Sequence, residues 1–420
     1  MRFSSFGDKF AAKSGIGELM EDLGHALAGG DMIMMGGGNP AHIPAVQERF
    51  KQRLTEIIDS PSEFRRLVGI YDPPQGELSF IRDVSDMLNR EFSWDLKPDN
   101  IALTNGSQAG FFMLFNLFAG QFSDGSHKQI QLPLAPEYIG YSDAGLSQSF
   151  FTANRPKIER IDSATFKYHV DFDALNIDET TGAICVSRPT NPTGNVLTDD
   201  EVARLDQVAR ENNIPLILDC AYGTPFPNLI FTEARPIWND NTIACFSLSK
   251  LGLPAARTGI VVANAEVIKA LSAVNGIMNL ATGSFGAMLA QDMVRSGEIL
   301  RISNTIVRPF YLDKAKRAEA CLRQYLQGTP FALHKAEGAM FLWLWLRDCP
   351  VTSQALYERL KARGVLVVPG HHFFPGLESG EDKNWRHKHE CLRITYSQDD
   401  ALVESGLAII GEEVKKAYAE

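Results

Sequence analysis

The chain has 420 residues, of which 45% are hydrophobic and 22% are charged, a composition typical of globular proteins. Its formal net charge of -10 at pH 7 argues against nucleic acid and against an anionic membrane surface as main partners, because both favour a basic face. No apolar run approaches the roughly 18–20 residues of a membrane span, and the N-terminal stretch MRFSSFGDKFAAKSG carries charges throughout, so we expect neither a membrane anchor nor a signal peptide.

The cysteines indicate the redox environment. None of the six forms a CxxC pair, so no zinc or redox motif is present. Several lie in apolar, strand-like runs, where a free cysteine behaves as a small hydrophobic residue. We therefore expect a cytoplasmic protein.

The first stretch of interest is TNGSQAG, residues 104–110, which separates a strand-like run from the apolar helix predicted for FFMLFNLFAG. A loop of small residues that enters a helix N-terminus offers free backbone N–H groups and the positive end of the helix dipole to an anion. A plain turn explains the same residues, so this stretch alone leaves both interpretations open.

The middle of the chain alternates strands and helices. The runs GAICVS, IPLILD, TIACFSLS and TGIVVAN are continuously apolar, which suggests strands buried on both faces of a parallel sheet. Between the first two, TDDEVARLDQVARENN predicts a helix with a Thr198/Glu201 capping box. Strand, helix and strand in this order form a βαβ unit, whose ligands bind beyond the carboxyl ends of the strands.

Polar residues stand at these strand ends. Asn191 lies in the rigid loop SRPTNPTGN, and Asp219 ends the strand of LDCAYG, three residues before Tyr222. A buried carboxylate needs a partner, which is either a neighbouring loop or a protonated nitrogen of a ligand. Lys250 ends the apolar stretch TIACFSLSK, where it either points into water or takes part in chemistry.

After about residue 305 the pattern changes to a smaller α+β unit. A helix over TIVRPFYLDKAKRAEACLRQYL precedes the strand GAMFLWLWL, the helix SQALYERLKARG and the strands VLVVPG and CLRITY. Arg393 interrupts the last strand, so it either snorkels to water or binds an anion. We expect a large α/β domain over residues 50–305 and a small α+β domain over residues 1–49 and 306–420.

An anion site, a buried carboxylate, a phenol, a lysine and an arginine together suit one cofactor, pyridoxal 5'-phosphate. The lysine amine binds the aldehyde of this cofactor as an imine, and the carboxylate keeps its pyridine nitrogen protonated.

The motifs NGSQ, NPTG, DCAY and SLSKLGLPAARTG, in this order and followed by Arg393, resemble the class I/II aminotransferases of fold type I. The resemblance covers most of the chain and implies a mainly parallel central sheet sandwiched by helices. The stretches MMGGGNPAHIP, LPLAPEYIGYSDAGL, ICVSRPTNPTGN and VPGHHFFPGL are similar to members of this family that exchange the amino group between L-valine and pyruvate. Such a reaction gives 3-methyl-2-oxobutanoate and L-alanine by a ping-pong route.

The resemblance also implies roles for individual residues. Lys250 matches the catalytic lysine, and Asp219 matches the partner of the pyridine nitrogen. The remaining cofactor contacts that it implies are Gly106, Ser107, Gln108, Tyr138, Asn191, Tyr222, Ser247 and Arg257. The implied substrate contacts are Gly38, Asn191 and Arg393, and Tyr71 matches a tyrosine that reaches the phosphate of a neighbouring subunit, which implies a homodimer.

The late histidines and the overall framework allow other interpretations. Paired spacing of His371, His372, His387 and His389 is compatible with a metal, but no ligand pattern surrounds them, so we expect no metal site. A lyase or a cyclopropane-forming synthase on the same framework, or an aminotransferase for other small aliphatic amino acids, would keep the cofactor. A transcription regulator would need an added DNA-binding domain, for which we expect no room because the motifs begin near residue 36.

Overall fold

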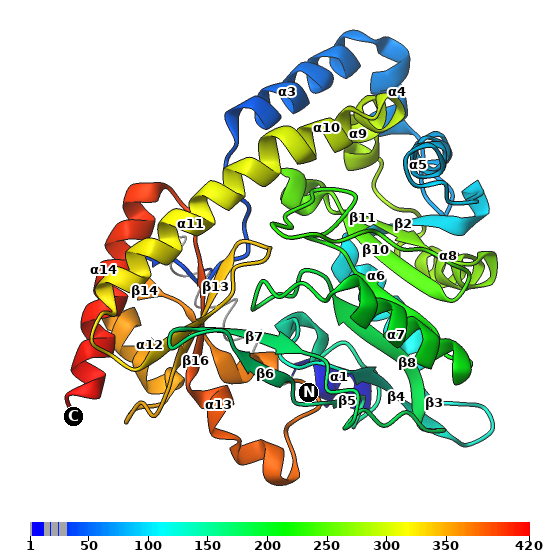
Figure 1. The fold of residues 1–420 in the computed structure, drawn as a ribbon. Helices are drawn as coiled ribbons and strands as arrows, with labels where there is room; N and C mark the ends of the chain where they lie inside the picture. Colours follow the sequence, from blue (N-terminus) through cyan, green and yellow to red (C-terminus); the bar gives the residue numbers. More distant parts are fainter. Residues whose placement is uncertain (1, 12–16, 18–23, 25–31) are drawn as a thin grey trace.

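The computed structural model describes residues 2–11, 17, 24 and 32–420. Two sheets, each accompanied by helices, make up most of this part of the chain (Figure 1). Much of the N-terminal portion of the predicted small domain, residues 12–16, 18–23 and 25–31, lies outside the described residues.

The first sheet has eight strands in the order β2–β11–β10–β9–β8–β4–β3, with β5 beside β4. The strands are β2 Ile101–Asn105, β3 Gly120–Gln121, β4 His127–Leu132, β5 Phe151–Ala153, β8 Thr181–Ser187, β9 Leu216–Asp219, β10 Thr242–Ser247 and β11 Thr258–Val262. The central strands β5, β4, β8, β9 and β10 run parallel to one another. Every residue of β8, β9 and β10 is buried, which explains their continuously apolar sequences.

Helices cover both faces of this sheet, as the sequence predicts. The principal ones are α5 Leu78–Phe92, α6 Ser107–Phe118, α7 Asp199–Glu211, α8 Ala265–Asn279 and α9 Phe285–Ser296. Successive residues of a strand face opposite sides, so Ile217 packs with α6 and α8 whereas Leu216 and Leu218 pack with α7. The predicted capping box of α7 is confirmed by reciprocal contacts of Thr198 and Glu201.

One strand differs from the expectation. TGIVVAN forms β11, which is fully buried but runs antiparallel to both β10 and β2. A parallel pair needs a crossover of a dozen or more residues, whereas only residues 248–257 connect β10 to β11. This short connection forms two single turns, η3 Ser249–Leu251 and η4 Pro254–Ala256.

The second sheet has six strands in the order β15–β16–β13–β12–β7–β6. The strands are β6 Lys157–Arg160, β7 Thr165–His169, β12 Phe331–His334, β13 Phe341–Leu346, β15 Val368–Pro369 and β16 Cys391–Thr395. A separate parallel pair joins β1 Ile33–Met34 to β14 Val365–Leu366, so the predicted strand VLVVPG is divided between two sheets. The hairpin β6–β7 belongs to this second sheet, although its residues lie within the range 50–305 predicted for the large domain. The division into two domains stays a prediction.

The long helices of the C-terminal part lie beside one another at one end of the molecule (Figure 1). They are α11 Arg308–Tyr325, α12 Ser353–Ala362 and α14 Asp400–Tyr418. The remaining helices are α1 Ser5–Ala11, α3 Pro44–Asp59, α4 Pro61–Gly69, α10 Glu298–Ile302 and α13 Arg386–His389. Short turns are η1 Pro98–Asn100, η2 Ile139–Tyr141, η6 Gly370–Phe373 and η7 Gly380–Asn384, and a π-helical turn, η5 Ser303–Val307, leads into α11.

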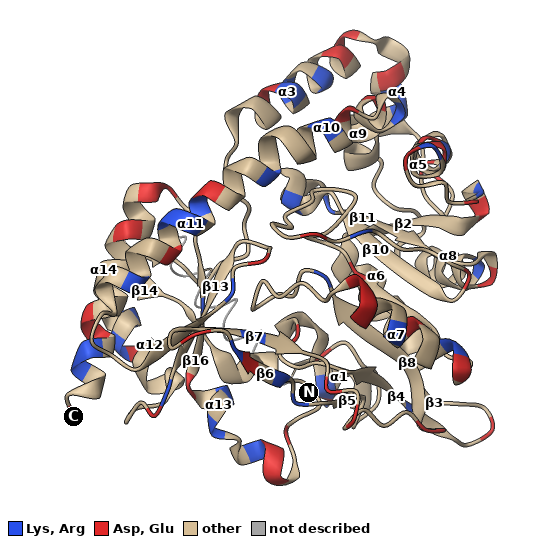
Figure 2. Ribbon diagram, viewed as in Figure 1, with Lys and Arg blue, Asp and Glu red and all other residues tan. Residues whose placement is uncertain are grey.

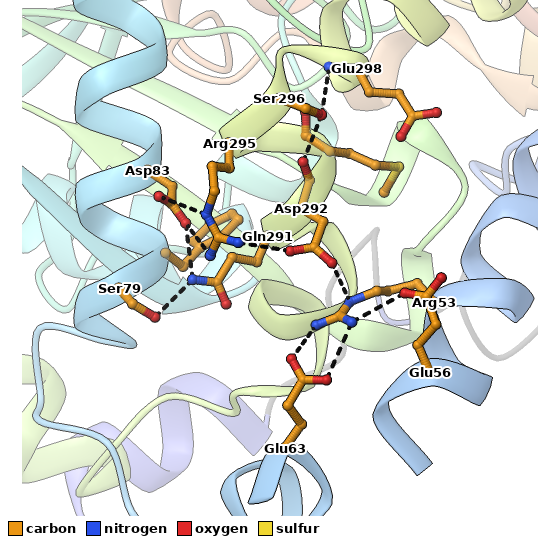
Figure 3. A network of polar contacts seen from close by, with 12 residues as sticks. Arg53, Glu56, Glu63, Ser79, Asp83, Gln291, Asp292, Arg295, Ser296 and Glu298 are labelled. Atoms are coloured by element: carbon orange, nitrogen blue, oxygen red, sulfur yellow. Dashed lines mark hydrogen bonds and ion pairs between the residues drawn. The ribbon is translucent and has the colours of Figure 1, made fainter. Parts of the chain in front are cut away.

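Helices α3 and α4 are attached to α9 by a polar network (Figure 3). At its centre the buried guanidinium of Arg53 contacts Glu63 at 2.6 Å, Asp292 at 3.1 Å and Glu56 at 3.2 Å. Arg295 of α9 continues the network, because its Nη1 lies 3.0 Å from a carboxylate oxygen of the same Asp292. The N-terminal helices are therefore fixed to the large sheet by charge as well as by apolar contact.

Charges are spread over the outer helices and are rare on the central strands (Figure 2). Helices α3, α11 and α14 carry both signs, whereas β8 and β10 contain no charged residue. No helix in the described part of the chain is long and apolar enough to cross a membrane.

Candidate active site

A cavity of about 330 Å³ lies where β8, β9 and β10 end and strand β16 of the second sheet approaches them. Ser187, Asp219 and Ser247 are the last residues of the three strands and all line it. Predicted site residues that line the cavity are Gly38, Ser107, Gln108, Tyr138, Asn191, Asp219, Tyr222, Ser247, Lys250, Arg257 and Arg393. The sheet thus brings together residues that are far apart in the sequence, at the edge where parallel sheets bind ligands.

Lys250 lies in the turn η3, directly after β10. Its Nζ donates a 2.6 Å hydrogen bond to the carbonyl oxygen of Gly38 and lies 5.3 Å from the ring centroid of Tyr222. Burial, and then the positive charges of Arg393 and Arg257, lower the pKa of this amine to about 8. A lysine with such a pKa has a substantial neutral fraction near pH 8, as a nucleophile or a proton acceptor requires.

The N-terminus of α6 lines the cavity with Ser107 and Gln108. Gly106 precedes this helix with φ +82°, and a Cβ atom placed on it would lie 2.2 Å from Nη2 of Arg257. The guanidinium is therefore packed against the backbone at the helix start, where the first N–H groups have no helical acceptor. The Arg257 Nη1 group also donates to Pro254 O at 3.3 Å and to Ser249 Oγ at 3.5 Å.

Asp219 provides the negative charge of the site. Its Oδ1 accepts a hydrogen bond of 2.9 Å from the Ala221 N–H group, and its Oδ2 accepts one of 2.7 Å from the Tyr141 hydroxyl. Burial raises the pKa of Asp219, and these two donors together with the charge of Lys250 partly counteract the rise. A carboxylate in this position is suited to pair with a cationic nitrogen of a ligand.

A second carboxyl group lies close by and belongs to Glu137, which is almost fully buried. Its Oε1 accepts a 2.8 Å hydrogen bond from the N–H of Ser187, and its Oε2 contacts the hydroxyl of the same serine. Burial, with a further contribution from the charge of Asp219, raises the pKa of Glu137 to about 8. Glu137 is therefore mainly neutral at pH 7.

Arg393 enters the cavity from β16 of the second sheet. Its Nη1 donates to Asn191 Oδ1 at 2.8 Å, and its Nη2 donates to Gly36 O at 2.6 Å. The guanidinium carbon lies 4.4 Å from the ring centroid of Phe341 and 5.0 Å from that of Phe373. Burial lowers the pKa of Arg393 to about 10, so it keeps its charge at neutral pH and can bind a carboxylate.

The segment of residues 35–41 is held over the cavity by the C-terminal part of the chain. The N–H of Thr395 donates to Met35 O, and the hydroxyl of Ser397 donates to Asn39 O, both at 2.8 Å. The N–H of Ala41 donates to the hydroxyl of Tyr311 at 2.7 Å. These contacts position the carbonyl groups of Gly36 and Gly38 against Arg393 and Lys250.

These residues fit pyridoxal phosphate. Lys250, Arg257 and Arg393 give the cavity three cationic groups, and Asp219 is the one acidic residue among the described residues that line it. A cation packed against a helix N-terminus suits a phosphate, and a carboxylate at the other end suits a protonated ring nitrogen. Buried Nε of Arg393 and Oε1 of Gln108 have no hydrogen-bond partner in the described part of the chain, so polar groups are available to a ligand.

Two predicted residues do not line the cavity. Gly106 acts from behind, because its lack of a side chain admits Arg257. Tyr71 lies in a separate groove with Thr282, Gly283 and Ser284, and its side chain is 83% exposed. The adjacent Asp72 is buried and bonded to Arg66 and Ser284, so the loop that presents Tyr71 to solvent is anchored on both sides.

The late histidines form two small clusters beside the site. His371 stacks on His389 with ring centroids 5.5 Å apart and packs against His372, while His387 contacts the hydroxyl of Tyr168 in the core of the second sheet. Burial lowers the pKa of His371 and of His387 to about 3. No group of three or more His, Cys, Asp or Glu residues in the described part of the chain is arranged to hold a metal ion.

Sequence reasoning missed several residues that shape the site. Ser249 supports Arg257, Phe341 and Phe373 flank Arg393, and Tyr141 bonds to Asp219. Tyr141 stands three residues after Tyr138 in PEYIGY, and this spacing is the one signal that was available.

Comparisons with known proteins show the family of the chain. A family model described as aminotransferase class I and II matches residues 33–410. The chain is 51% identical over 420 residues to the valine–pyruvate aminotransferase of Escherichia coli (strain K12), with each chain covered completely. A crystal structure of a putative amino-acid aminotransferase from Psychrobacter arcticum 273-4 superposes with a TM-score of 0.97 at 46% identity over both complete chains. The crystal structure of valine–pyruvate aminotransferase from Salmonella typhimurium LT2 gives 0.88 at 49% identity, with 97% of this chain and all of the other covered.

Proposed function

The chain belongs to the class I and II aminotransferases, and from this premise we propose that it transfers the amino group of L-valine to pyruvate. The products are 3-methyl-2-oxobutanoate and L-alanine. The observation that carries the proposal is the position of Lys250, which lines a single cavity together with Arg393 and Asp219 and has a pKa of about 8. The full-length similarity to two valine–pyruvate aminotransferases supports this pair of substrates.

When bound, pyridoxal phosphate supplies an aldehyde that takes up the amino group and a ring that accepts the electron pair released at the substrate Cα. Arg257, Ser107 and Ser247, which line the cavity, would hold its phosphate with the first N–H groups of α6. Asp219 would keep its ring nitrogen protonated. Tyr222 and Asn191 would hold its ring oxygen, and Tyr138 would hold its ring.

Lys250 moves the proton. In the first half-reaction its neutral amine accepts the proton from Cα of L-valine, and in the second half-reaction it returns a proton to Cα derived from pyruvate. Arg393 binds the α-carboxylate, which places Cα toward Lys250 and provides the same anchor for both substrates. The route is ping-pong, because 3-methyl-2-oxobutanoate must leave before pyruvate occupies the same site.

The charge of the cavity favours substrates with one carboxylate. Lys250, Arg257 and Arg393 are the cationic residues among the described residues that line it, and each has a role in the proposal. A distal carboxylate of an acidic amino acid would find no further cation there. Amino acids with small aliphatic side chains carry no distal carboxylate. Among them, L-valine is the substrate that the similarity to valine–pyruvate aminotransferase supports.

We propose that two copies of the chain form the active enzyme. Two grooves carry exposed apolar residues: Val68, 65% exposed, lines one, and Ile277 and Leu280, 89% and 61% exposed, stand within two positions of Met278, which lines the other. One of these grooves is lined by Met278 together with Gln108 and Arg257, so the apolar surface continues to the phosphate end of the cavity. Tyr71, which is 83% exposed, would then reach the phosphate of the second copy. Such a patch on a single chain is a mark of an interface.

A cytoplasmic location is part of the same proposal. All six cysteines are free, and four of them are buried, as suits a reducing compartment. Fractionation of cells that express the protein, with detection of the chain in each fraction, tests this location.

The half-reaction tests the function. The purified protein, loaded with pyridoxal phosphate, is mixed with L-valine alone, and its absorption spectrum is followed beside that of Lys250→Ala. We expect the visible band of the wild type to convert to the amino form of the cofactor and pyruvate to restore it. If L-valine leaves the spectrum unchanged while another amino acid converts it, the proposed substrate is wrong.

A further inference from the structure

We propose that Tyr141 is a positioning residue of the reaction, whose hydroxyl group keeps Asp219 ionised and thereby keeps the proton on the ring nitrogen of the cofactor. This inference rests on the proposed function, because it concerns pyridoxal phosphate in the same cavity. Tyr141 itself does not line the cavity, so it acts through Asp219.

The geometry of the contact is specific. Each oxygen of Asp219 accepts one hydrogen bond: Oδ1 from the backbone of Ala221 at 2.9 Å and Oδ2 from Tyr141 at 2.7 Å. Two bonds to different oxygens fix the plane of the carboxylate as well as its position. The Ala221 bond is local in sequence, whereas Tyr141 comes from η2, 78 residues earlier.

The aromatic residues around Tyr141 hold its ring in place. Its side chain is fully buried, and its ring packs against Phe111, Phe115 and Tyr138 with centroids 5.2, 5.1 and 5.5 Å apart. Burial, followed by the charge of Asp219, raises the pKa of the Tyr141 hydroxyl well above its ordinary value. The hydroxyl therefore stays protonated and acts toward Asp219 as a donor.

A donor is needed here because other features of the site disfavour the carboxylate. Burial raises the pKa of Asp219, and a second carboxyl group, Glu137, shares the same desolvated region. Glu137 accepts hydrogen bonds from the N–H groups of Ser187 and Tyr138, at 2.8 and 3.3 Å, and its pKa of about 8 leaves it mainly neutral at pH 7. The negative charge of the pair consequently resides on Asp219.

The other ionisable groups that act on Asp219 do not replace Tyr141. The positive charge of Lys250 favours the carboxylate, but the lysine loses this charge as it titrates near its pKa of about 8. Burial raises the pKa of each of three neighbouring thiols, so they are neutral and contribute no charge; these are Cys185, Cys220 and Cys245.

The Asp219 carboxylate and the ring nitrogen of the cofactor are two bases that would share one proton. A hydrogen bond to a charged group changes its acid dissociation constant roughly 10- to 100-fold. Without the hydroxyl of Tyr141, Asp219 becomes a stronger base than it is in the wild type, by this factor. It therefore takes a larger share of the proton that it shares with the ring nitrogen. The ring nitrogen then becomes more neutral, and the ring accepts electrons less well.

The experiment measures that proton directly. Pyridoxal phosphate labelled with ¹⁵N in the ring is bound to the wild type, to Tyr141→Phe and to Tyr168→Phe, and the ring ¹⁵N chemical shift is recorded by NMR. Tyr168 is a matched control, because it is also a fully buried tyrosine whose hydroxyl is hydrogen-bonded, to Trp343 and His387, but in the second sheet. We expect the signal of Tyr141→Phe to move toward that of unprotonated pyridine, and the signal of Tyr168→Phe to stay at the wild-type position.

The outcomes separate the two proposals. If wild-type protein does not bind pyridoxal phosphate, the proposed function fails. If it binds and Tyr141→Phe gives the wild-type signal, or if both variants shift equally, the role of Tyr141 is overturned and the proposed function stands. Should Tyr141→Phe fail to fold, Tyr141→Met provides a second side chain without a hydroxyl. In either variant we expect kcat to fall roughly 10- to 100-fold with KM for L-valine little changed.

Discussion

The amine of Lys250 donates a 2.6 Å hydrogen bond to the carbonyl oxygen of Gly38, although the two residues are 212 positions apart. Gly38 belongs to the segment that Thr395 and Ser397 hold in place from the second sheet. Lys250, which follows a strand of the large sheet, is thus bonded to a segment that the C-terminal part of the chain positions. The environment of this amine leads to the first prediction.

Lys250 is expected to titrate with a pKa of about 8 in the cofactor-free protein, because burial and the charges of Arg393 and Arg257 disfavour its ammonium form. The pKa is lowered, so the reactive neutral amine is scarce below pH 8 and predominates above it. We therefore expect the rate at which the cofactor-free protein takes up pyridoxal phosphate covalently to rise through pH 8 and then level off. Stopped-flow absorbance over a pH series measures this rate.

The same pH series, repeated with a variant, tests the cause of the lowered pKa. Arg393→Met removes the positive charge that lowers the pKa of Lys250 most, so its midpoint should move to higher pH than that of the wild type. A wild-type rate that continues to rise up to the ordinary pKa of lysine would contradict the prediction.

Arg393→Lys should weaken substrate binding without loss of the cofactor. Lysine keeps the charge but not the planar pair of N–H groups that bond to Asn191 and to Gly36. We expect kcat/KM for L-valine to fall roughly 10- to 100-fold, since hydrogen bonds to charged groups contribute about 1.5–3 kcal/mol. Half-reaction kinetics measure the change, and Arg363→Lys, whose arginine pairs with Glu412 and Glu413 on α14, is the control. Equal losses in both variants would argue against a role in substrate binding.

Gly106→Ala should disrupt the phosphate site. Its Cβ would lie 2.2 Å from Nη2 of Arg257, and φ at this position is +82°, so the variant combines a clash with backbone strain. Gly125→Ala is the matched control, because Gly125 has a φ of +89° but no atom within 4 Å of the added Cβ. Equilibrium dialysis with pyridoxal phosphate should show at least ~10-fold weaker binding for Gly106→Ala and unchanged binding for Gly125→Ala. Comparable affinity of the two variants would mean that Arg257 does not act in the phosphate site.

Arg53→Met should destabilise the N-terminal helices. The substitution keeps an apolar side chain of similar length but leaves Glu56, Glu63 and Asp292 without their shared cation. Because these carboxylates are partly exposed, we expect a loss of about 1–3 kcal/mol in the free energy of unfolding. Chemical denaturation measures it. Arg65→Met, on the exposed side of α4, should change the free energy of unfolding little. A similar loss in this control would mean that the contacts of Arg53 with the three carboxylates are not the cause of the destabilisation.

The proposed sharing of active sites between two copies can be tested by mixing Lys250→Ala and Tyr71→Ala, each of which we expect to be inactive alone. In a mixed dimer, one site combines the intact Lys250 of one copy with the intact Tyr71 of the other. We expect refolding of an equal mixture to restore up to about one quarter of the wild-type activity, since half of the dimers are mixed and each has one intact site. No recovery, in mixtures that sedimentation shows to be dimeric, would place Tyr71 outside the partner's site.

Much of the site could be predicted because its residues stand at the ends of apolar runs. Asp219 and Lys250 follow buried strands, and parallel strands bring their carboxyl ends to one edge. Tyr141 could not be predicted in this way, because its contact with Asp219 depends on how the η2 turn packs against β9. Gly106 is predicted as a cofactor contact, but its close approach to Arg257 could not be predicted, because that arginine comes from a distant loop.

The fold shows the same division between local and distant information. The helix after Thr198 is encoded within a few residues by its capping box, and the structure has it where the sequence predicts it. The direction of β11 depends instead on the length of the connection from β10, which apolar periodicity does not express. The position of the hairpin β6–β7 depends on β12, which follows it by more than 150 residues.

That hairpin has a consequence for biosynthesis. Since a ribosome makes the chain from its N-terminus, β1 and β7 emerge long before β14 and β12, the strands with which they pair. Until β12, residues 331–334, is translated, β7 has an unpaired edge that is free to join another polypeptide. A nascent chain of this protein therefore needs protection at that edge, and a ribosome stalled before residue 331 would release a product prone to aggregate.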